Sequence, residues 1–328
     1  MKIRLKPLRD QTMVITGATS AVGASLARKA ARRGARLVLA APDDDALRDL
    51  TGELERHGAQ AVAVSADLSD LADLRRIVDA ALERFGSFDS WVNIPVASLG
   101  GAPAEASLAD QRRLFDSSYW SVVHGSLAAA PHLKLHGGAL VNIGGVPGTR
   151  AGPALATVSA SRQAVKGFTH ALRMELEQEK VPVSVTLITP STVDAPRAQD
   201  IESSGARSAY LADLVAETVL HACQHPLRDL NVGPGGGRIA LLGHLAPRLS
   251  GRRVPLAAAR RAASGEPRPG AAHEEQSGIA VDAGERDGSP RHAVYAVAAH
   301  HPLLAAGAVV GLGLLAWHLL GASPRRTD

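Results

Sequence analysis

The stretch TMVITGATSAVG, residues 12–23, decides the fold. Its first five residues, Thr12–Thr16, form a run rich in β-branched side chains, which predicts a buried strand. A turn containing Gly17 and Gly23 follows, and residues 22–33 then repeat apolar side chains at helical spacing until Gly34 ends the pattern. A glycine turn between a strand and a helix is typical of a cradle for the pyrophosphate of a dinucleotide, because the helix N-terminus offers free N–H groups and a positive dipole end.

The same alternation continues along the chain. Further strands are predicted at residues 36–40, 61–65, 89–93, 139–143, 182–188 and 229–232, and further helices at residues 44–57, 70–85, 107–135, 157–179 and 209–225. Such alternation predicts a Rossmann-like, doubly wound α/β domain, in which a parallel sheet is covered by helices on both faces.

Composition and charge exclude some function classes. The chain has 328 residues, of which 45% are apolar and 3% aromatic, and its net charge is +4. This mild charge, without basic residues interleaved with aromatic ones, predicts no nucleic-acid binding. The single cysteine, Cys223, excludes an intramolecular disulfide. Residues 1–7 lack the apolar run of a signal peptide, so we expect the folded domain to be cytoplasmic.

The composition changes after about residue 250. We predict a Rossmann domain over residues 1–250, a flexible linker over 251–293, a transmembrane helix over 294–322 and a short tail over 323–328. The most apolar part, residues 302–320, would span roughly 28 Å as a helix, close to the thickness of a bilayer's hydrocarbon core. The alternative is a buried helix of the soluble domain. Arginines on both sides of the segment leave its orientation open.

Several motifs together resemble the short-chain dehydrogenase/reductase superfamily across residues 5 to about 235. Thr16, Gly17 and Gly23 match the glycine motif TGxxxGxG of that family, Asp67 matches its acid near the adenine, and Asn93 matches the first residue of its NNAG motif. The stretch from Gly167 to Leu176 resembles the family's long helix after the active site. C-terminal membrane tails occur in some bacterial members.

The resemblance implies NAD or NADP as cofactor. The residues that it assigns to cofactor binding are Thr16, Gly17, Ser20, Val22, Gly23, Asp67, Leu68, Asn93, Arg162, Pro190 and Val193. Three contacts depart from the family pattern, at Ala21, Val96 and Ala195. We therefore expect the cofactor to bind weakly or to have been lost. Asp43 follows the second strand and would repel a 2′-phosphate, which favours NAD slightly.

The resemblance also implies a catalytic tetrad of serine, tyrosine, lysine and asparagine, in which the tyrosine exchanges a proton with the substrate while hydride moves at the nicotinamide. Here the tyrosine position is Val158 and the lysine position is Arg162. The serine position, thirteen residues before Val158, is Gly145, and the asparagine position is Ser118. None of the four catalytic groups is intact.

Three interpretations remain open. The first is a membrane-tethered pseudoenzyme, and the second is an active oxidoreductase that uses another proton donor, with His124, His170 or Tyr119 as candidates. The third is a scaffold that binds nothing. In all three we expect a homo-oligomer, because the resemblance implies that the helices at residues 107–135 and 157–179 form a dimer surface, as they do in most relatives. Residues 191–207 are expected to form the loop that closes over substrate.

Overall fold

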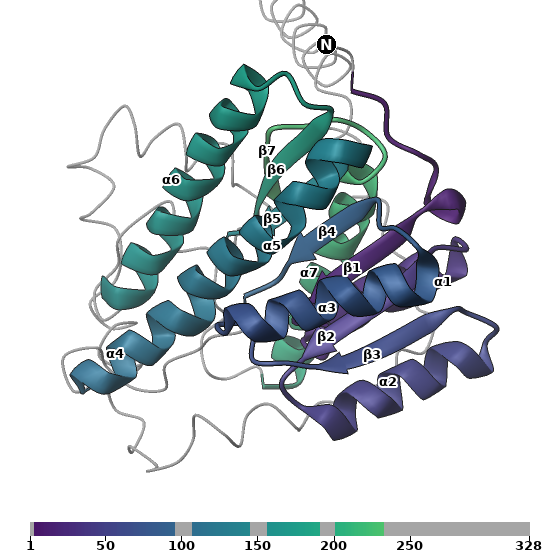
Figure 1. Cartoon of the computed structure of the whole chain (residues 1–328). Coiled ribbons are helices and arrows are strands. Elements are labelled where there is room, and N and C mark those ends of the chain that lie inside the picture. The colour runs from purple at the N-terminus through teal and green to yellow at the C-terminus, as the bar shows by residue number, and fades with distance from the viewer. Residues whose placement is uncertain (1–2, 96–106, 145–155, 191–200, 233–328) are drawn as a thin grey trace, which may run out of the picture. The chain divides into compact units, whose positions relative to one another are not determined.

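The computed structural model describes residues 3–95, 107–144, 156–190 and 201–232, the last range with side chains from residue 211 onward. Its centre is a parallel seven-stranded sheet of order β3-β2-β1-β4-β5-β6-β7 (Figure 1). The strands are β1 (Thr12–Thr16), β2 (Arg36–Ala41), β3 (Ala61–Ser65), β4 (Ser90–Asn93), β5 (Gly138–Ile143), β6 (Val183–Pro190) and β7 (Asp229–Val232). The predicted Rossmann-like fold is confirmed.

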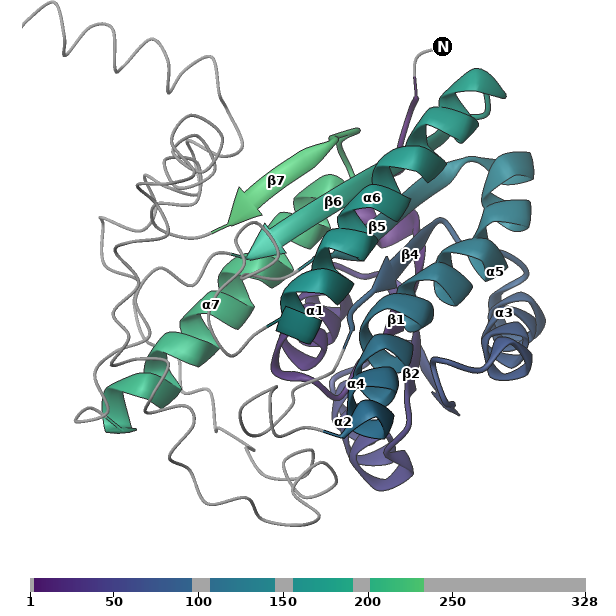
Figure 2. The ribbon, with the colours of Figure 1, turned by 90° about the vertical axis from the view of Figure 1, so that its left-hand side faces the viewer.

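Helices cover both faces of the sheet (Figures 1 and 2). The helices are α1 (Ala21–Arg32), α2 (Asp44–Arg56), α3 (Leu71–Phe85), α4 (Leu108–Phe115), α5 (Ser121–His136), α6 (Ala156–Gln178) and α7 (Ile201–Ala222), with short turns η1 (Leu8–Asp10) and η2 (Asp116–Trp120). Apolar side chains of α1, α2 and α7 pack on one face, and those of α3, α5 and α6 pack on the other.

Successive residues of β1 pack into the two hydrophobic cores on opposite faces of the sheet. Met13 and Ile15 belong to the core under α1, whereas Val14 belongs to the core under α3 and α5, and all three are fully buried. This follows from the pleat, which sends successive side chains to opposite faces. A strand that is buried on both faces reads as a continuous apolar run, which is why the sequence predicts it so clearly.

The strand order reverses at β1, which pairs with β2 on one side and β4 on the other. In open α/β sheets, ligands bind beyond the carboxyl ends of the strands at such a switch point. Thr16, at the end of β1, pairs in register with Asn93, at the end of β4. The predicted cradle therefore lies where the topology favours a ligand.

Two helices differ from the prediction. The helix expected over residues 107–135 contains a π-helical turn at η2, between α4 and α5. The last helix begins at Ile201 and not near residue 209, so part of the expected substrate loop at 191–207 is helical. Ser203, Ser204 and Gly205 are weak helix formers, which explains the late predicted start.

Within the described residues, no helix is long and apolar enough to cross a membrane. The segments predicted as a linker, membrane helix and tail, residues 251–328, lie outside the described residues. The same holds for Gly145 and Val193 of the predicted site, and for Val96 and Ala195.

Candidate functional site

The glycine turn after β1 is held by one serine. Ser20 caps α1: its hydroxyl donates to the carbonyl of Gly17 (2.7 Å) and accepts from the amide of Gly23 (3.1 Å). Gly17 has a φ of 68°, in the left-handed region that favours glycine. A Cβ on Gly23 would lie 2.2 Å from the Gly17 carbonyl oxygen. The turn itself therefore requires glycine at both positions.

The start of α1 forms the floor of the predicted pyrophosphate site. Ala21 and Val22 are the first two residues of α1, and the amides of a helix's first turn have no intrahelical acceptor. Ala21 stands where the family has its middle glycine, and it is exposed, so its methyl group displaces nothing in the protein. Thr16 fixes the neighbouring strand end, because its hydroxyl donates to the carbonyl of Val92 (3.3 Å). These amides can bind an anion, and the Ala21 methyl group narrows the space through which a pyrophosphate would reach them.

Asp67 follows β3, which is separated from β1 by β2 in the sheet, and it is exposed. Its carboxylate accepts from the amide (2.9 Å) and the hydroxyl (2.7 Å) of Ser69, and its own amide donates to the Asp73 carboxylate (2.7 Å). That donation is the largest influence that lowers the pKa of Asp73. Leu68, the next residue, is buried. One oxygen of Asp67 thus forms no hydrogen bond to the described part of the chain.

Asp43, which favours NAD in the sequence, caps α2 by accepting from the amide of Ala46 (3.0 Å). Its carboxylate is half-buried after the end of β2, and the preference for NAD that it implies stays a prediction.

The Asn93 side chain is turned into the protein. Its amide group donates to Asn142 Oδ1 (2.8 Å) and to the Ser126 hydroxyl (3.1 Å), and its oxygen accepts from the indole of Trp91 (2.8 Å). Asn142 in turn donates to the hydroxyl of Thr169 on α6 (3.0 Å). This buried network ties β4 and β5 to α5 and α6. Asn93 thereby has a structural role, and its assignment to cofactor binding stays a prediction.

Helix α6 carries two of the tetrad positions. Val158 and Arg162 are four residues apart on α6 and thus share one side of the helix. Both are half-buried, and burial lowers the pKa of the Arg162 guanidinium. Beside them, the hydroxyl of Ser159 is buried and has no hydrogen-bond partner in the described structure. No side chain on this turn offers a phenol or an amine.

Ser118, at the asparagine position, lies in the π-helical turn η2 and is buried. Its hydroxyl donates to the carbonyl of Leu114, one turn back in α4. Pro190, another predicted cofactor contact, ends β6 and is half-buried.

The candidate replacement donors are dispersed. His170 Nε2 lies 3.1 Å from the carboxylate of Asp229, at the β7 edge of the sheet. Tyr119 packs edge-on against Phe115 and Phe168, with ring centroids 6.2 and 6.4 Å away. His124 Nδ1 donates to the carbonyl of Ser69, in the loop before α3 (2.7 Å). Of the three, Tyr119 is the one that packs on α6 near the face that carries Val158, because it packs against the apolar cluster that includes Val165, two turns further along the helix.

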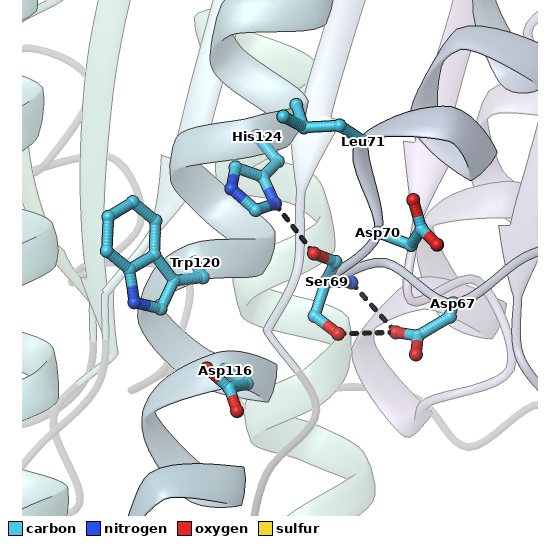
Figure 3. Close-up of a pocket in the computed structure, with 7 residues that line it drawn as sticks. All are labelled: Asp67, Ser69, Asp70, Leu71, Asp116, Trp120 and His124. Carbon is cyan, nitrogen blue, oxygen red and sulfur yellow. Dashed lines mark hydrogen bonds between the residues drawn. The ribbon is translucent and has the colours of Figure 1, made fainter.

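A cavity that the sequence does not predict opens beside Asp67. Its volume is about 670 Å³, and it is lined by Asp67, Ser69, Asp70, Leu71, Asp116, Trp120 and His124 (Figure 3). Its walls come from the loop before α3 and from η2 and α5, so only the tertiary fold brings them together. One signal was available, since Trp120 and His124 are four residues apart on one helical face.

Comparisons with known proteins agree with this architecture. The sequence model described as short chain dehydrogenase matches residues 11–205. A relative from Bacillus subtilis (strain 168), described as uncharacterized oxidoreductase YxnA, is 37% identical over 96% of this chain and 92% of its own. The 1-deoxy-11-beta-hydroxypentalenate dehydrogenase of Streptomyces avermitilis is 31% identical over 66% of this chain and 82% of its own.

Solved structures lead to the same family. A short chain dehydrogenase/reductase from Burkholderia phymatum in complex with NAD superposes with a TM-score of 0.66 at 25% identity, covering 75% of this chain and 97% of that one. A metagenomic short-chain oxidoreductase in complex with NADP superposes with a TM-score of 0.58 at 27% identity, and the match covers 69% of this chain and 98% of that one. With the glycine turn, the strand order and these matches in agreement, the chain belongs to the short-chain dehydrogenase family.

Proposed function

We propose that this chain is a membrane-tethered, oxidoreductase-like member of its family that binds an NAD(P) dinucleotide weakly and has lost most of its catalytic power. The nucleotide would lie across the switch point, with its pyrophosphate at the first-turn amides of α1 and its adenine end near Asp67. The capped turn of Gly17, Ser20 and Gly23 supports this placement. Complexes of similar structures with NAD and with NADP support the class of ligand.

The observation that carries the loss of catalysis is Val158 on α6. A bound nicotinamide supplies or accepts hydride, and the protein must then supply or remove a proton at the substrate oxygen. Val158 has no titratable atom, and a guanidinium such as that of Arg162 does not release its proton readily. Losing a positioned acid typically slows the reaction by about 10²–10⁴-fold. Arg162 keeps a charge that suits ribose hydroxyls.

The test is a calorimetric titration of the full chain with NAD, NADH, NADP and NADPH, combined with turnover measurements on a panel of carbonyl substrates. We expect weak binding, tighter for NAD than for NADP because of Asp43, and no turnover at ordinary enzyme rates. The triple variant Val158→Tyr, Arg162→Lys, Gly145→Ser should gain activity if the pocket still admits substrate. Turnover by the unchanged protein at rates typical of dehydrogenases would refute the pseudoenzyme.

The second candidate function is an active NAD(P)-dependent oxidoreductase with a non-standard proton donor. The dehydrogenases among the relatives favour it. It predicts that one substitution, His124→Gln, His170→Gln or Tyr119→Phe, abolishes a measurable turnover while nucleotide affinity is unchanged. If none of the three substitutions affects turnover, none of these side chains is the proton donor and this second function loses its support.

Membrane attachment through residues 294–322 is also proposed, with the main domain in the cytoplasm. The support is the composition of this region, since residues 292–324 contain no aspartate, glutamate, lysine or arginine. We expect the full chain to fractionate with membranes and a variant that ends at residue 290 to remain in the supernatant. Equal partition of the two would refute the tether.

A homo-oligomer is proposed from the uncovered apolar surface of α5 and α6. Leu135 is 81% exposed, Met174 57% and Leu127 49%. Exposed side chains of this size on neighbouring helices are typical of an interface. Leu135→Glu should lower the mass measured by light scattering to that of a monomer. The matched control Leu82→Glu, on α3, should leave the mass unchanged.

A further inference from the structure

The edge of the sheet at which the strands begin carries a group of arginines. Because the strands are parallel, the helices that connect them run back and end at this edge (Figure 1). Four arginines at this edge, named the basic edge, form no ion pair with another described residue: Arg32 at the end of α1, Arg36 at the start of β2, Arg56 at the end of α2 and Arg84 in the last turn of α3. Arg36 is half-buried and the other three are exposed. The acids beside them in the sequence, Glu55 and Glu83, leave the arginines in excess.

Two charges of the basic edge meet at one aromatic ring. The guanidinium carbon of Arg36 lies 5.6 Å from the centroid of the Phe85 ring, and that of Arg84 lies 5.4 Å from it. The two charges are therefore no further apart than the sum of these distances, which is comparable to the Debye length of about 8–10 Å. The helix dipole favours cations at helix C-termini, but Arg36 belongs to a strand, so the dipole does not account for the pair. Such a like-charged pair attracts an anionic surface.

The opposite edge of the sheet carries the other sign. Asp43 and Asp70 cap α2 and α3, and Asp44, Asp45 and Asp73 lie in the first turns of these helices. The glycine turn after β1, where the nucleotide is proposed to bind, is at this edge too. A negatively charged surface would thus attract the basic edge and repel the edge that holds the nucleotide site.

We propose that the basic edge docks on the anionic phospholipid surface of a bilayer and thereby turns the nucleotide site away from the membrane. The proposal rests on the proposed membrane attachment, which would hold the domain beside lipid headgroups at a high effective concentration. Guanidinium groups suit lipid phosphates, because they can donate two parallel hydrogen bonds to one phosphate. This attachment favours a lipid surface over a nucleic acid, which is the other polyanion that these arginines could contact.

The test measures energy transfer from a fluorophore on the full chain to an acceptor carried by a lipid. Gln60→Cys places the label beside the basic edge, since Gln60 is exposed and directly precedes β3. Leu108→Cys places it at the opposite edge, at the start of α4. The natural cysteine, Cys223, is fully buried, so the label reacts with the introduced one.

The labelled chain is added to vesicles of phosphatidylcholine, with or without phosphatidylglycerol. With phosphatidylglycerol at low salt, we expect transfer from position 60 to exceed transfer from position 108. High salt should remove the difference, because it screens the charges. Equal transfer from the two positions at low salt would overturn the proposal.

Substitutions show whether the arginine pair is responsible. Arg36→Gln together with Arg84→Gln should shift the equilibrium from docked to undocked domains about 25-fold, or about fivefold for each charge removed. Arg36→Lys together with Arg84→Lys keeps the charges and should keep most of the docking. The matched control, Arg48→Gln together with Arg75→Gln, removes the same charge from exposed positions nearer the opposite edge and should leave the transfer unchanged. Equal loss in the glutamine pair and in this control would overturn the proposal.

Failure of the membrane attachment has a different signature. Without that attachment, no transfer occurs to vesicles of phosphatidylcholine alone at any salt, whereas docking on phosphatidylglycerol is still observed at low salt. A DNA duplex tests the competing partner. If the duplex binds the chain more tightly than the anionic vesicles do, and Arg36→Gln together with Arg84→Gln abolishes that binding, the basic edge belongs to a nucleic-acid site and the proposal is overturned.

Discussion

Gly125 on α5 offers a sharp test of the role assigned to Asn93. A Cβ at this position would lie 2.2 Å from Asn93 Oδ1 and 3.2 Å from the indole nitrogen of Trp91. Asn93 has no room to yield, because Trp91, Ser126 and Asn142 hold its amide at 2.8–3.1 Å. Gly125→Ala must therefore break this network or push α5 away from the sheet.

The magnitude follows from what would be lost. Each buried polar group left without a partner costs about 1–3 kcal/mol, and overpacking a core costs typically about 1–3 kcal/mol. Replacing glycine by alanine within a helix returns up to about 1 kcal/mol. With about two hydrogen bonds of Asn93 broken, we expect Gly125→Ala to lower the free energy of unfolding by about 3–5 kcal/mol.

The assay is urea denaturation followed by circular dichroism, with Gly167→Ala on α6 as the control. A Cβ on Gly167 would meet nothing within 4 Å. This variant should be as stable as the unchanged protein or more stable by up to about 1 kcal/mol. If Gly125→Ala unfolds within about 0.5 kcal/mol of the unchanged protein, by the resolution of such measurements, the network does not hold Asn93 as argued. The side chain of Asn93 would then be free to serve a ligand.

Three further predictions concern stability. Burial raises the pKa of the Cys223 thiol to about 12, so the unfolded chain loses this proton near pH 8.5 while the folded chain keeps it. The free energy of unfolding should therefore fall by about 1.4 kcal/mol per pH unit as the pH rises above about 9. Urea unfolding at about pH 9 and about pH 11 measures this fall, which should be smaller in Cys223→Ala than in the unchanged protein. Arg173, which donates to the carbonyls of Val185 (2.8 Å) and Arg228 (2.7 Å), holds β7, so Arg173→Met should cost about 2–4 kcal/mol and speed amide hydrogen exchange in β7. Ser20→Ala should cost about 1 kcal/mol in thermal unfolding and Ser20→Gly only a few tenths, and equal losses would contradict the capping role.

The sequence predicts the sheet well because its strands are buried on both faces. Thr12–Thr16 and Ala61–Ser65 have the predicted bounds, since runs of β-branched and small apolar residues end where turn residues begin. The π-helical turn at η2 escapes prediction because its residues, Asp116–Trp120, include no glycine or proline that would mark an irregular turn. Helix α7 is longer than predicted because Gly205 resembles a helix end when its packing is unknown.

The candidate site is predictable only in parts. The turn residues can be found because their spacing is local, and Ser20 caps the helix as its residue type suggests. The inward direction of Asn93 is not predictable, since the partners Ser126, Asn142 and Thr169 come from three other elements. The cavity escapes prediction for the same reason, because Asp67 and Trp120 lie far apart in the sequence and meet only through packing.

The distribution of retained and changed residues supports the proposed loss of chemistry. Gly23 is kept where a side chain would collide with the Gly17 carbonyl, so the fold alone requires it. Asn93 is kept where it satisfies a buried network. The changed positions Ala21 and Val158 are exposed or half-buried, and substitutions there cost the fold little. This pattern is expected if selection for hydride transfer is relaxed while selection for stability continues. The retained glycines are therefore weak support for nucleotide binding, and the calorimetric titration with nucleotides is the measurement that tests it.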